Sequence, residues 1–157
     1  MTTEERATVR VTRRYVASAM RVFEAWVDPP RIERWITALA PQDEVVRFAV
    51  KPRVRHAFVL VVRRGREEVS YSGEYLEIIR PQRIVFTWVE PVVSKETMLV
   101  SIELSPVPSA FGGTDLLLRH ERVLPSEANR TEARWSAVLD AIAAMVEPWG
   151  TQPASLR

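Results

Sequence analysis

The sequence predicts an α+β fold in which a curved antiparallel sheet of about seven strands packs against one long C-terminal helix. Two patterns support this prediction. Apolar residues recur at helical spacing over residues 126–147, whereas from Val45 to Val123 apolar and polar residues mostly alternate. Short turns join the expected strands, and such turns connect antiparallel neighbours. Strands followed by a separate helix form the pattern of an α+β domain.

The N-terminal part is expected to contain one strand and two short helices. Alternation predicts the strand over Thr8 to Tyr15. Ser18 is a suitable N-cap for the first helix, and Asp28 caps the second, with Pro29 at its first position. We interpret the apolar residues of these helices, up to Trp35, as closing one end of the sheet and not as reading DNA.

Six further strands and the long helix follow. Ser126 is the expected N-cap of that helix, Glu127 lies in its first turn, and Pro148 ends it after Glu147. Its apolar stripe consists of Trp135, Val138, Leu139, Ile142, Met145 and Val146. The six strands are expected at 44–50, 54–62, 68–78, 83–90, 97–105 and 114–123.

The length of 157 residues predicts a single domain, with a core over residues 8–147 and a frayed tail over 148–157. A chain of this size can bury about 70% of its unfolded surface. The sequence has no cysteine, which excludes disulfides and thiolate chemistry. It also shows no secretory leader and no apolar run long enough to span a membrane, so we expect a soluble, cytoplasmic protein without a membrane span.

The charge pattern gives no indication of a nucleic-acid partner. The net charge is only +2, although the pI is about 9.4 because 20 arginines stand against 2 lysines. The arginines are spread along the chain between acidic residues. One cluster, Arg63, Arg64 and Arg66, lies at a predicted hairpin tip, where we expect the charges to be solvated.

Several segments resemble the START-like superfamily (Bet v 1-like, SRPBCC), specifically the branch named after the activator of heat-shock protein 90 ATPase. The most specific segment is TRRYVASAMRVFEAWVDPPRIERW, residues 12–35. SGEYLEIIRPQRIVFTW (72–88), GGTDLLLRHE (ending at Glu121) and a C-terminal helix with Trp135 match as well. The resemblance covers about residues 8–147 and implies the helix-grip fold with a hydrophobic cavity between the sheet and the helix.

Alternation suggests which side chains face that cavity. Most are apolar or aromatic, as in pockets for hydrophobic or aromatic small molecules. Inward-facing aromatic side chains more often form an ordinary core than contact a ligand. The candidate ligand contacts are Trp35, His56, Phe58, Tyr71, Tyr75, Phe86, Trp88, Met98, Ile102, Leu118, His120, Trp135 and Leu139.

The sequence contains none of the common catalytic motifs: no G-x-S-x-G elbow, H-E-x-x-H, P-loop or G-x-G-x-x-G. We expect no cofactor and no metal site, because there is no cysteine and the two histidines lie on separate strands. If the protein is an enzyme, His120, Glu90 and Tyr71 are the candidate acid-base groups. Glu90 precedes Pro91 at a strand end, where we expect it to be solvated.

Three hypotheses follow. The preferred one is a binding protein for a lipid, polyketide or aromatic metabolite. A cavity of several hundred Å³ would favour it, and a core filled by Phe58, Trp88 and Trp135 would count against it. The second is a cyclase- or hydrolase-like enzyme, and the third is a co-chaperone-like binder of a heat-shock protein 90 type ATPase. Val59 and Val61, expected to face outward, hint at a covered surface such as a homodimer interface.

Overall fold

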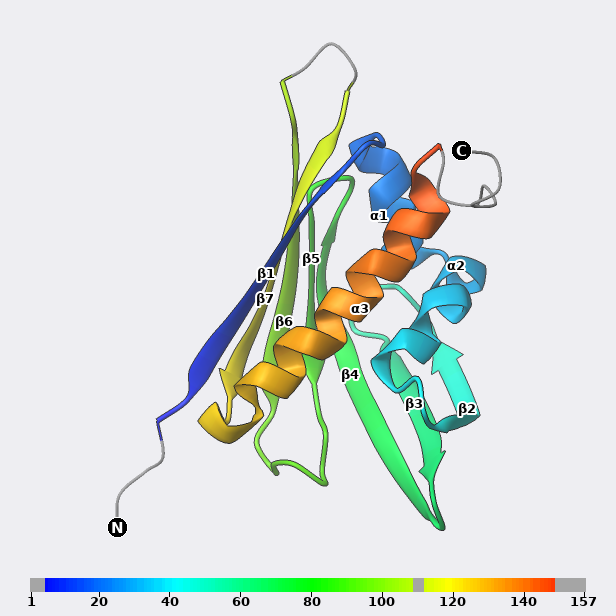
Figure 1. The fold of residues 1–157 in the computed structure, drawn as a ribbon, viewed down its shortest axis with the longest axis vertical. Coiled ribbons are helices and arrows are strands. Elements are labelled where there is room, and N and C mark those ends of the chain that lie inside the picture. Colours follow the sequence, from blue (N-terminus) through cyan, green and yellow to red (C-terminus); the bar gives the residue numbers. More distant parts are fainter. Residues whose placement is uncertain (1–4, 109–111, 149–157) are drawn as a thin grey trace.

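The computed structural model describes residues 5–108 and 112–148, which form one antiparallel sheet and a layer of helices (Figure 1). Within these residues the seven strands are ordered β1-β7-β6-β5-β4-β3-β2. The strands are β1 Ala7–Tyr15, β2 Glu44–Val50, β3 Ala57–Arg64, β4 Glu67–Ile79, β5 Arg83–Trp88, β6 Met98–Pro106 and β7 Thr114–Val123. The helices are α1 Ala19–Val27, α2 Pro29–Trp35, α3 Ala128–Val146 and the short 3₁₀ turns η1 Ile36–Leu39 and η2 Pro125–Glu127.

The helix α3 runs diagonally across one face of the sheet, and α1 and α2 lie on the same side (Figure 1). The residues of the predicted apolar stripe face the sheet: Trp135, Val138, Leu139 and Ile142 are fully buried. Burying this stripe against the curved sheet provides the main hydrophobic stabilisation of the helix. The predicted α+β helix-grip fold is confirmed.

Alternation predicted the inward faces of the central strands correctly. On β7, Leu116, Leu118 and His120 are buried, and their neighbours are partly exposed. On β6, the residues expected inside are likewise buried: Met98, Val100, Ile102 and Leu104. One-sided strands of an antiparallel sheet show this period of two because successive side chains point to opposite faces.

The helix ends show one correct prediction and one error. Ser18 caps α1, since its side-chain oxygen accepts a hydrogen bond from the Arg21 amide at 3.2 Å. Ser126, by contrast, is not the N-cap of the long helix. It lies within the turn η2, and α3 begins only at Ala128. Pro125 favours this tighter first turn, because it has no amide proton to donate.

The third strand begins later than predicted. The expectation was 54–62, but residues 53–56 form a turn, and β3 begins at Ala57. Arg55 adopts a left-handed conformation with φ of 72°, which interrupts an extended strand. As a result, His56 is exposed and does not face the interior, contrary to the prediction.

Two further findings concern the described residues as a whole. Within them, no helix combines the length and the apolar character needed to cross a membrane. No three His, Asp or Glu side chains in the same segments converge closely enough to hold a metal ion. The tail from residue 149 onward, expected to be frayed, lies outside the described residues, as does part of the turn predicted between 106 and 113.

Candidate functional site

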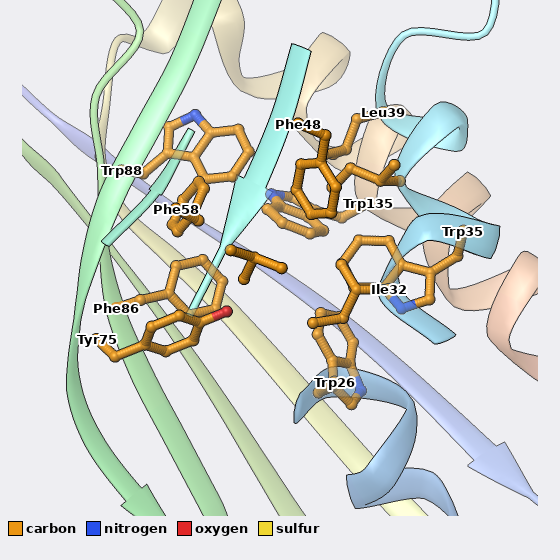
Figure 2. Close-up of a pocket in the computed structure, with 12 residues that line it drawn as sticks. Trp26, Ile32, Trp35, Leu39, Phe48, Phe58, Tyr75, Phe86, Trp88 and Trp135 are labelled. Atoms are coloured by element: carbon orange, nitrogen blue, oxygen red, sulfur yellow. The ribbon is translucent and has the colours of Figure 1, made fainter. Parts of the chain in front are cut away.

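A small cavity lies between the sheet and the helices, enclosed mainly by aromatic side chains (Figure 2). Its volume is about 30 Å³, which leaves room for ordered water but is about a tenth of the smallest typical ligand pocket. The lining residues come from the helical layer and from strands β2 to β5: Trp26, Ile32, Trp35, Ile36, Leu39, Phe48, Val50, Phe58, Tyr75, Phe86, Trp88 and Trp135.

Aromatic packing explains why the cavity is small. The Trp88 ring lies 5.3 Å from the Trp135 ring and 5.8 Å from Phe58, measured between ring centroids. On the helical side, Trp26 and Trp35 are 5.0 Å apart. These distances are typical of tilted aromatic contacts in a packed core. The structure contains no cavity of several hundred Å³ at this position, and the core is filled by Phe58, Trp88 and Trp135, the outcome expected to count against the ligand-binding hypothesis.

Two polar groups among the described lining residues have no hydrogen-bond partner: the hydroxyl of Tyr75, which faces the interior of the cavity (Figure 2), and the indole N–H of Trp26. Within the described residues this hydroxyl makes no hydrogen bond to the protein, and burial raises the pKa of Tyr75. Three of the surrounding indole N–H groups are already used: Trp35 donates to the Ala25 carbonyl at 2.8 Å, Trp88 to Glu90, and Trp135 to His120. The Tyr75 hydroxyl is therefore available to a guest molecule.

The predicted ligand contacts fall into three groups. Trp35, Phe58, Tyr75, Phe86, Trp88 and Trp135 line the cavity. His56 lies on the exposed turn before β3. The remaining six are buried elsewhere in the core: Tyr71, Met98, Ile102, Leu118, His120 and Leu139.

Sequence reasoning missed half of the lining. These residues belong to α1, α2, η1 and β2: Trp26, Ile32, Ile36, Leu39, Phe48 and Val50. Alternation along β2 was the available signal for Phe48 and Val50. The helical residues could be recognised as buried, but their position opposite Phe58 and Tyr75 depends on how the helices dock.

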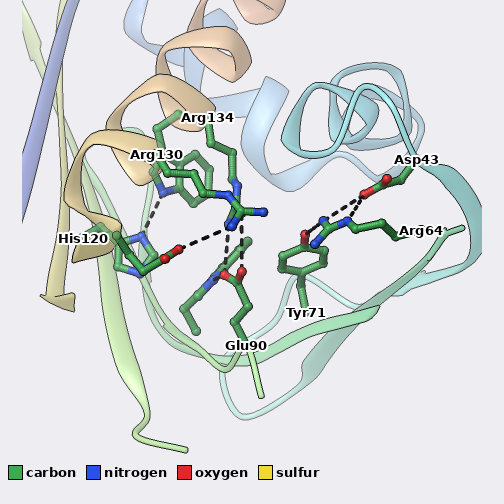
Figure 3. A network of polar contacts seen from close by, with 10 residues as sticks. Asp43, Arg64, Tyr71, Glu90, His120, Arg130 and Arg134 are labelled. Atoms are coloured by element: carbon green, nitrogen blue, oxygen red, sulfur yellow. Dashed lines mark hydrogen bonds and ion pairs between the residues drawn. The ribbon is translucent and has the colours of Figure 1, made fainter. Parts of the chain in front are cut away.

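A buried ion pair lies beside the aromatic core (Figure 3). Glu90 is only 4% exposed, so the expectation that it is solvated is wrong. Arg134 donates to Glu90 Oε1 at 2.9 Å, and the indole N–H of Trp88 donates to the same oxygen at 3.1 Å. The Arg134 side chain is itself only 9% exposed. Each charge is thus compensated by a partner, as burial requires.

A second set of contacts extends from this pair toward the β3–β4 hairpin (Figure 3). The Arg134 guanidinium lies over the Tyr71 ring, 5.3 Å from its centroid. Arg64 donates to the Tyr71 hydroxyl at 3.2 Å and forms an ion pair with Asp43 at 2.9 Å. Arg64 is therefore held in place by these partners. The expectation that its charge is freely solvated at a hairpin tip is wrong.

His120 is buried and neutral. The indole N–H of Trp135 donates to its Nδ1 at 2.9 Å, so the ring proton must be on Nε2. Nε2 is buried and has no hydrogen-bond partner among the described residues. Burial and, to a smaller extent, the nearby Arg134 charge together lower the pKa of His120 to about 3.

The three candidate acid-base groups do not hydrogen-bond to one another in the described structure. His120 is bonded to Trp135, Glu90 to Trp88 and Arg134, and Tyr71 to Arg64. An acid-base pair acting on one substrate would need both groups within reach of the same atoms. The arrangement gives no support to catalysis by this triad.

We expect His120 to make protein stability depend on pH. Its pKa in the folded protein, about 3, lies below the value of about 6.5 in an unfolded chain. Below pH 6.5 the unfolded chain therefore binds the proton first, and the stability that His120 contributes is lost as the pH falls toward 3. Between pH 7 and pH 5 this loss amounts to about 2 kcal/mol.

Urea unfolding of the wild type and of His120→Phe at pH 7 and pH 5 measures this contribution. The variant should lose less stability on acidification than the wild type. His56→Gln is the matched control, because the exposed His56 ring meets water in both states, and it should retain the wild-type difference. Equal losses in the wild type and in His120→Phe would contradict a buried neutral histidine.

Comparison with known proteins places this geometry in a family. Residues 16–147 match the family described as Activator of Hsp90 ATPase homolog 1-like protein. No curated protein matches the sequence. The structure is similar to protein CV1439 from Chromobacterium violaceum, with 26% sequence identity, a TM-score of 0.74, and coverage of 90% of this chain and 97% of the other.

Two more distant structures share the fold. Mll3558 from Rhizobium loti has 24% identity and a TM-score of 0.72, covering 92% of this chain and 100% of the other. CalU16 from Micromonospora echinospora has 22% identity and a TM-score of 0.62, covering 96% and 90%. The family match spans most of the sequence and agrees with the predicted resemblance to the START-like superfamily. The chain therefore belongs to the Activator of Hsp90 ATPase homolog 1-like family.

Proposed function

We propose that the protein binds a small, flat, hydrophobic molecule in the aromatic cavity, with the Tyr75 hydroxyl as the hydrogen-bonding group. The observation that carries this proposal is the unpaired Tyr75 hydroxyl within a wall of aromatic side chains. A mostly apolar site with one well-placed polar group is typical of ligand pockets. Proteins of this fold family also commonly bind small hydrophobic ligands.

The ligand must enlarge the cavity when it enters, and the wall formed by β2 is the part best suited to move. β2 lies at the edge of the sheet and pairs only with β3. Phe48 and Val50, its two residues in the lining, are only partly buried. Displacing them breaks fewer contacts than displacing the fully buried Trp135 of α3.

The other two hypotheses have less support. The isolation of His120, Glu90 and Tyr71 from one another argues against an enzyme that uses them. A chaperone-binding surface would require a contiguous exposed apolar patch. The large exposed apolar residues of the described segments belong to several elements and turns, and only Leu76 and Ile79 share a strand: Val16, Met20, Val46, Val54, Leu76, Ile79 and Val92.

Binding of naphthol and naphthalene, measured by calorimetry, tests the proposal. Both compounds are flat and apolar, but only naphthol can hydrogen-bond to Tyr75. We expect the wild type to bind both, and Tyr75→Phe to bind naphthol about fivefold more weakly while its affinity for naphthalene is unchanged, because one hydrogen bond is worth about 1 kcal/mol.

Tyr15→Phe is the matched control. The Tyr15 hydroxyl is also buried, but it donates to the Leu139 carbonyl at 2.9 Å and does not line the cavity. This variant should bind naphthol like the wild type. Native mass spectrometry of the purified protein is a second readout, since a retained ligand adds mass that disappears on denaturation. Absence of binding to both compounds would overturn the proposal.

A further inference from the structure

We propose that the natural ligand is an amphiphile whose anionic oxygen group, a carboxylate or a phosphate, binds in an arginine-lined cleft next to the aromatic cavity. This inference rests on the proposed function and specifies the class of ligand. The apolar part of the ligand would occupy the aromatic cavity, and its head group would bind in the cleft.

The cleft lies between α3 and the segment that connects η1 to β2, and its volume is about 320 Å³. It is thus far larger than the aromatic cavity. Small side chains on α3, Ala133 and Ala137, leave room on one side, and the loop from Ala38 to Asp43 forms the other. Three arginines complete the lining: Arg64, Arg130 and Arg134.

These arginines offer hydrogen-bond donors that the described residues do not use. Arg64 binds Asp43 and Tyr71 through Nε and Nη2, which leaves Nη1 available. Arg130 makes only a loose ion pair with Glu127, at 3.7 Å. Arg130 thus has no side-chain hydrogen bond among the described residues, although Glu127 offsets part of its charge. A guanidinium with free N–H groups is the preferred protein partner of carboxylate and phosphate.

The arginines are also positioned for this role. The pairs Arg64–Asp43 and Arg134–Glu90 hold two of the three guanidinium groups in place before any ligand arrives. Arg130 and Arg134 extend from α3 toward the side of the molecule that carries Tyr71 and Arg64 (Figure 3). Pre-positioned donors lower the entropy cost of binding.

Leu39 separates the cleft from the cavity. It is the one residue that lines both, and it is 4% exposed in the closed structure. It ends the short turn η1, so a small displacement of this turn would join the two spaces. On α3, Arg134 of the cleft directly precedes Trp135 of the cavity. A single ligand that displaces Leu39 would therefore contact both.

A matched pair of compounds, phenylhexanoic acid and phenylhexanamide, tests the inference by calorimetry at neutral pH. They share the apolar part and differ in the charge of the head group. We expect the wild type to bind the acid about tenfold more tightly than the amide. Charge-assisted hydrogen bonds at a partly exposed site strengthen binding by about this factor. Added salt should reduce this preference.

Arg130→Gln is the decisive variant, because Arg130 is exposed and its loss should leave the fold intact. It should lose most of the preference for the acid, and Arg64→Gln should have a similar effect. Arg10→Gln is the control, since it removes the same charge from an exposed position on β1, outside the cleft. Thermal unfolding of each variant separates weaker binding from unfolding.

The outcomes distinguish this inference from the proposed function. Equal affinity for acid and amide would overturn the inference and leave the cavity proposal standing. The same would follow if the preference for the acid survived in both Arg130→Gln and Arg64→Gln, since the head group would then bind elsewhere. Failure of both naphthol and naphthalene to bind would overturn the proposed function itself.

Discussion

Replacing Gly73 with alanine is expected to lower the free energy of unfolding by about 3 kcal/mol or more. A Cβ atom at this position would overlap the carbonyl oxygen of Thr87 and lie 2.6 Å from the Phe58 ring. The carbonyl belongs to the backbone of the neighbouring strand β5 and cannot move aside without breaking the sheet. Urea unfolding measures the loss of stability. In the most severe case the variant would not fold when expressed.

The position of Gly73 explains the severity. Gly73 lies where β4 has a neighbour on both sides: it pairs with Phe58 of β3, and on the other side Ser72 bridges Val89 and Tyr75 pairs with Phe86 of β5, so its Cα directly faces the Thr87 backbone. Glycine within a strand often marks such a close approach of backbones. Gly65→Ala is the matched control: nothing lies within 4 Å of its added Cβ, and only its φ of 64° opposes the change. We expect a cost of about 1 kcal/mol there.

Replacing Glu90 with glutamine is expected to cost about 3 kcal/mol, even though the side chain keeps its size. Glutamine retains an oxygen that can accept the Trp88 N–H but removes the negative charge beside Arg134. The guanidinium would then be buried without a counter-charge. Chemical denaturation at neutral pH measures the loss.

The double variant Glu90→Gln with Arg134→Met should be more stable than Glu90→Gln alone, because it removes the unpaired charge as well. The exposed ion pair between Arg31 and Asp28 provides the control. Arg31→Gln should change stability by about 0.5 kcal/mol at most, as is usual for surface pairs. If Glu90→Gln also lowered the free energy of unfolding by only about 0.5 kcal/mol, the negative charge of Glu90 would not be needed to stabilise the buried Arg134.

Side-chain periodicity was sufficient to predict the fold. The period of two on β6 and β7 identified their buried faces, and the helical spacing from Trp135 to Val146 identified the buried face of α3. These patterns are visible in the sequence because apolar side chains gain free energy when they are buried, and the geometry of a strand or helix turns one face at regular intervals toward the core. The predicted starts of α3 at Ser126 and of β3 before His56 were wrong, because local backbone geometry determines where these elements begin.

The candidate site was only partly predictable for a different reason. Sequence patterns indicate that Trp35 and Trp88 are buried, but not that aromatic rings from two layers fill the space between them. Likewise, Arg134 lies outside the apolar stripe of α3, and nothing in its surroundings along the chain indicates that Glu90 will bury it. Such contacts join residues far apart in sequence.

The sequence by itself therefore determined the family, the order of the elements and the inward faces of the sheet and the long helix. Only the tertiary structure decided that the aromatic core leaves about 30 Å³ and that Glu90 and Arg134 form a buried pair. It also decided that Arg64, Arg130 and Arg134 line one cleft. The physical reason is that burial is a property of single residues and leaves a periodic trace, whereas cavities and ion pairs depend on the angle and distance at which separate elements pack.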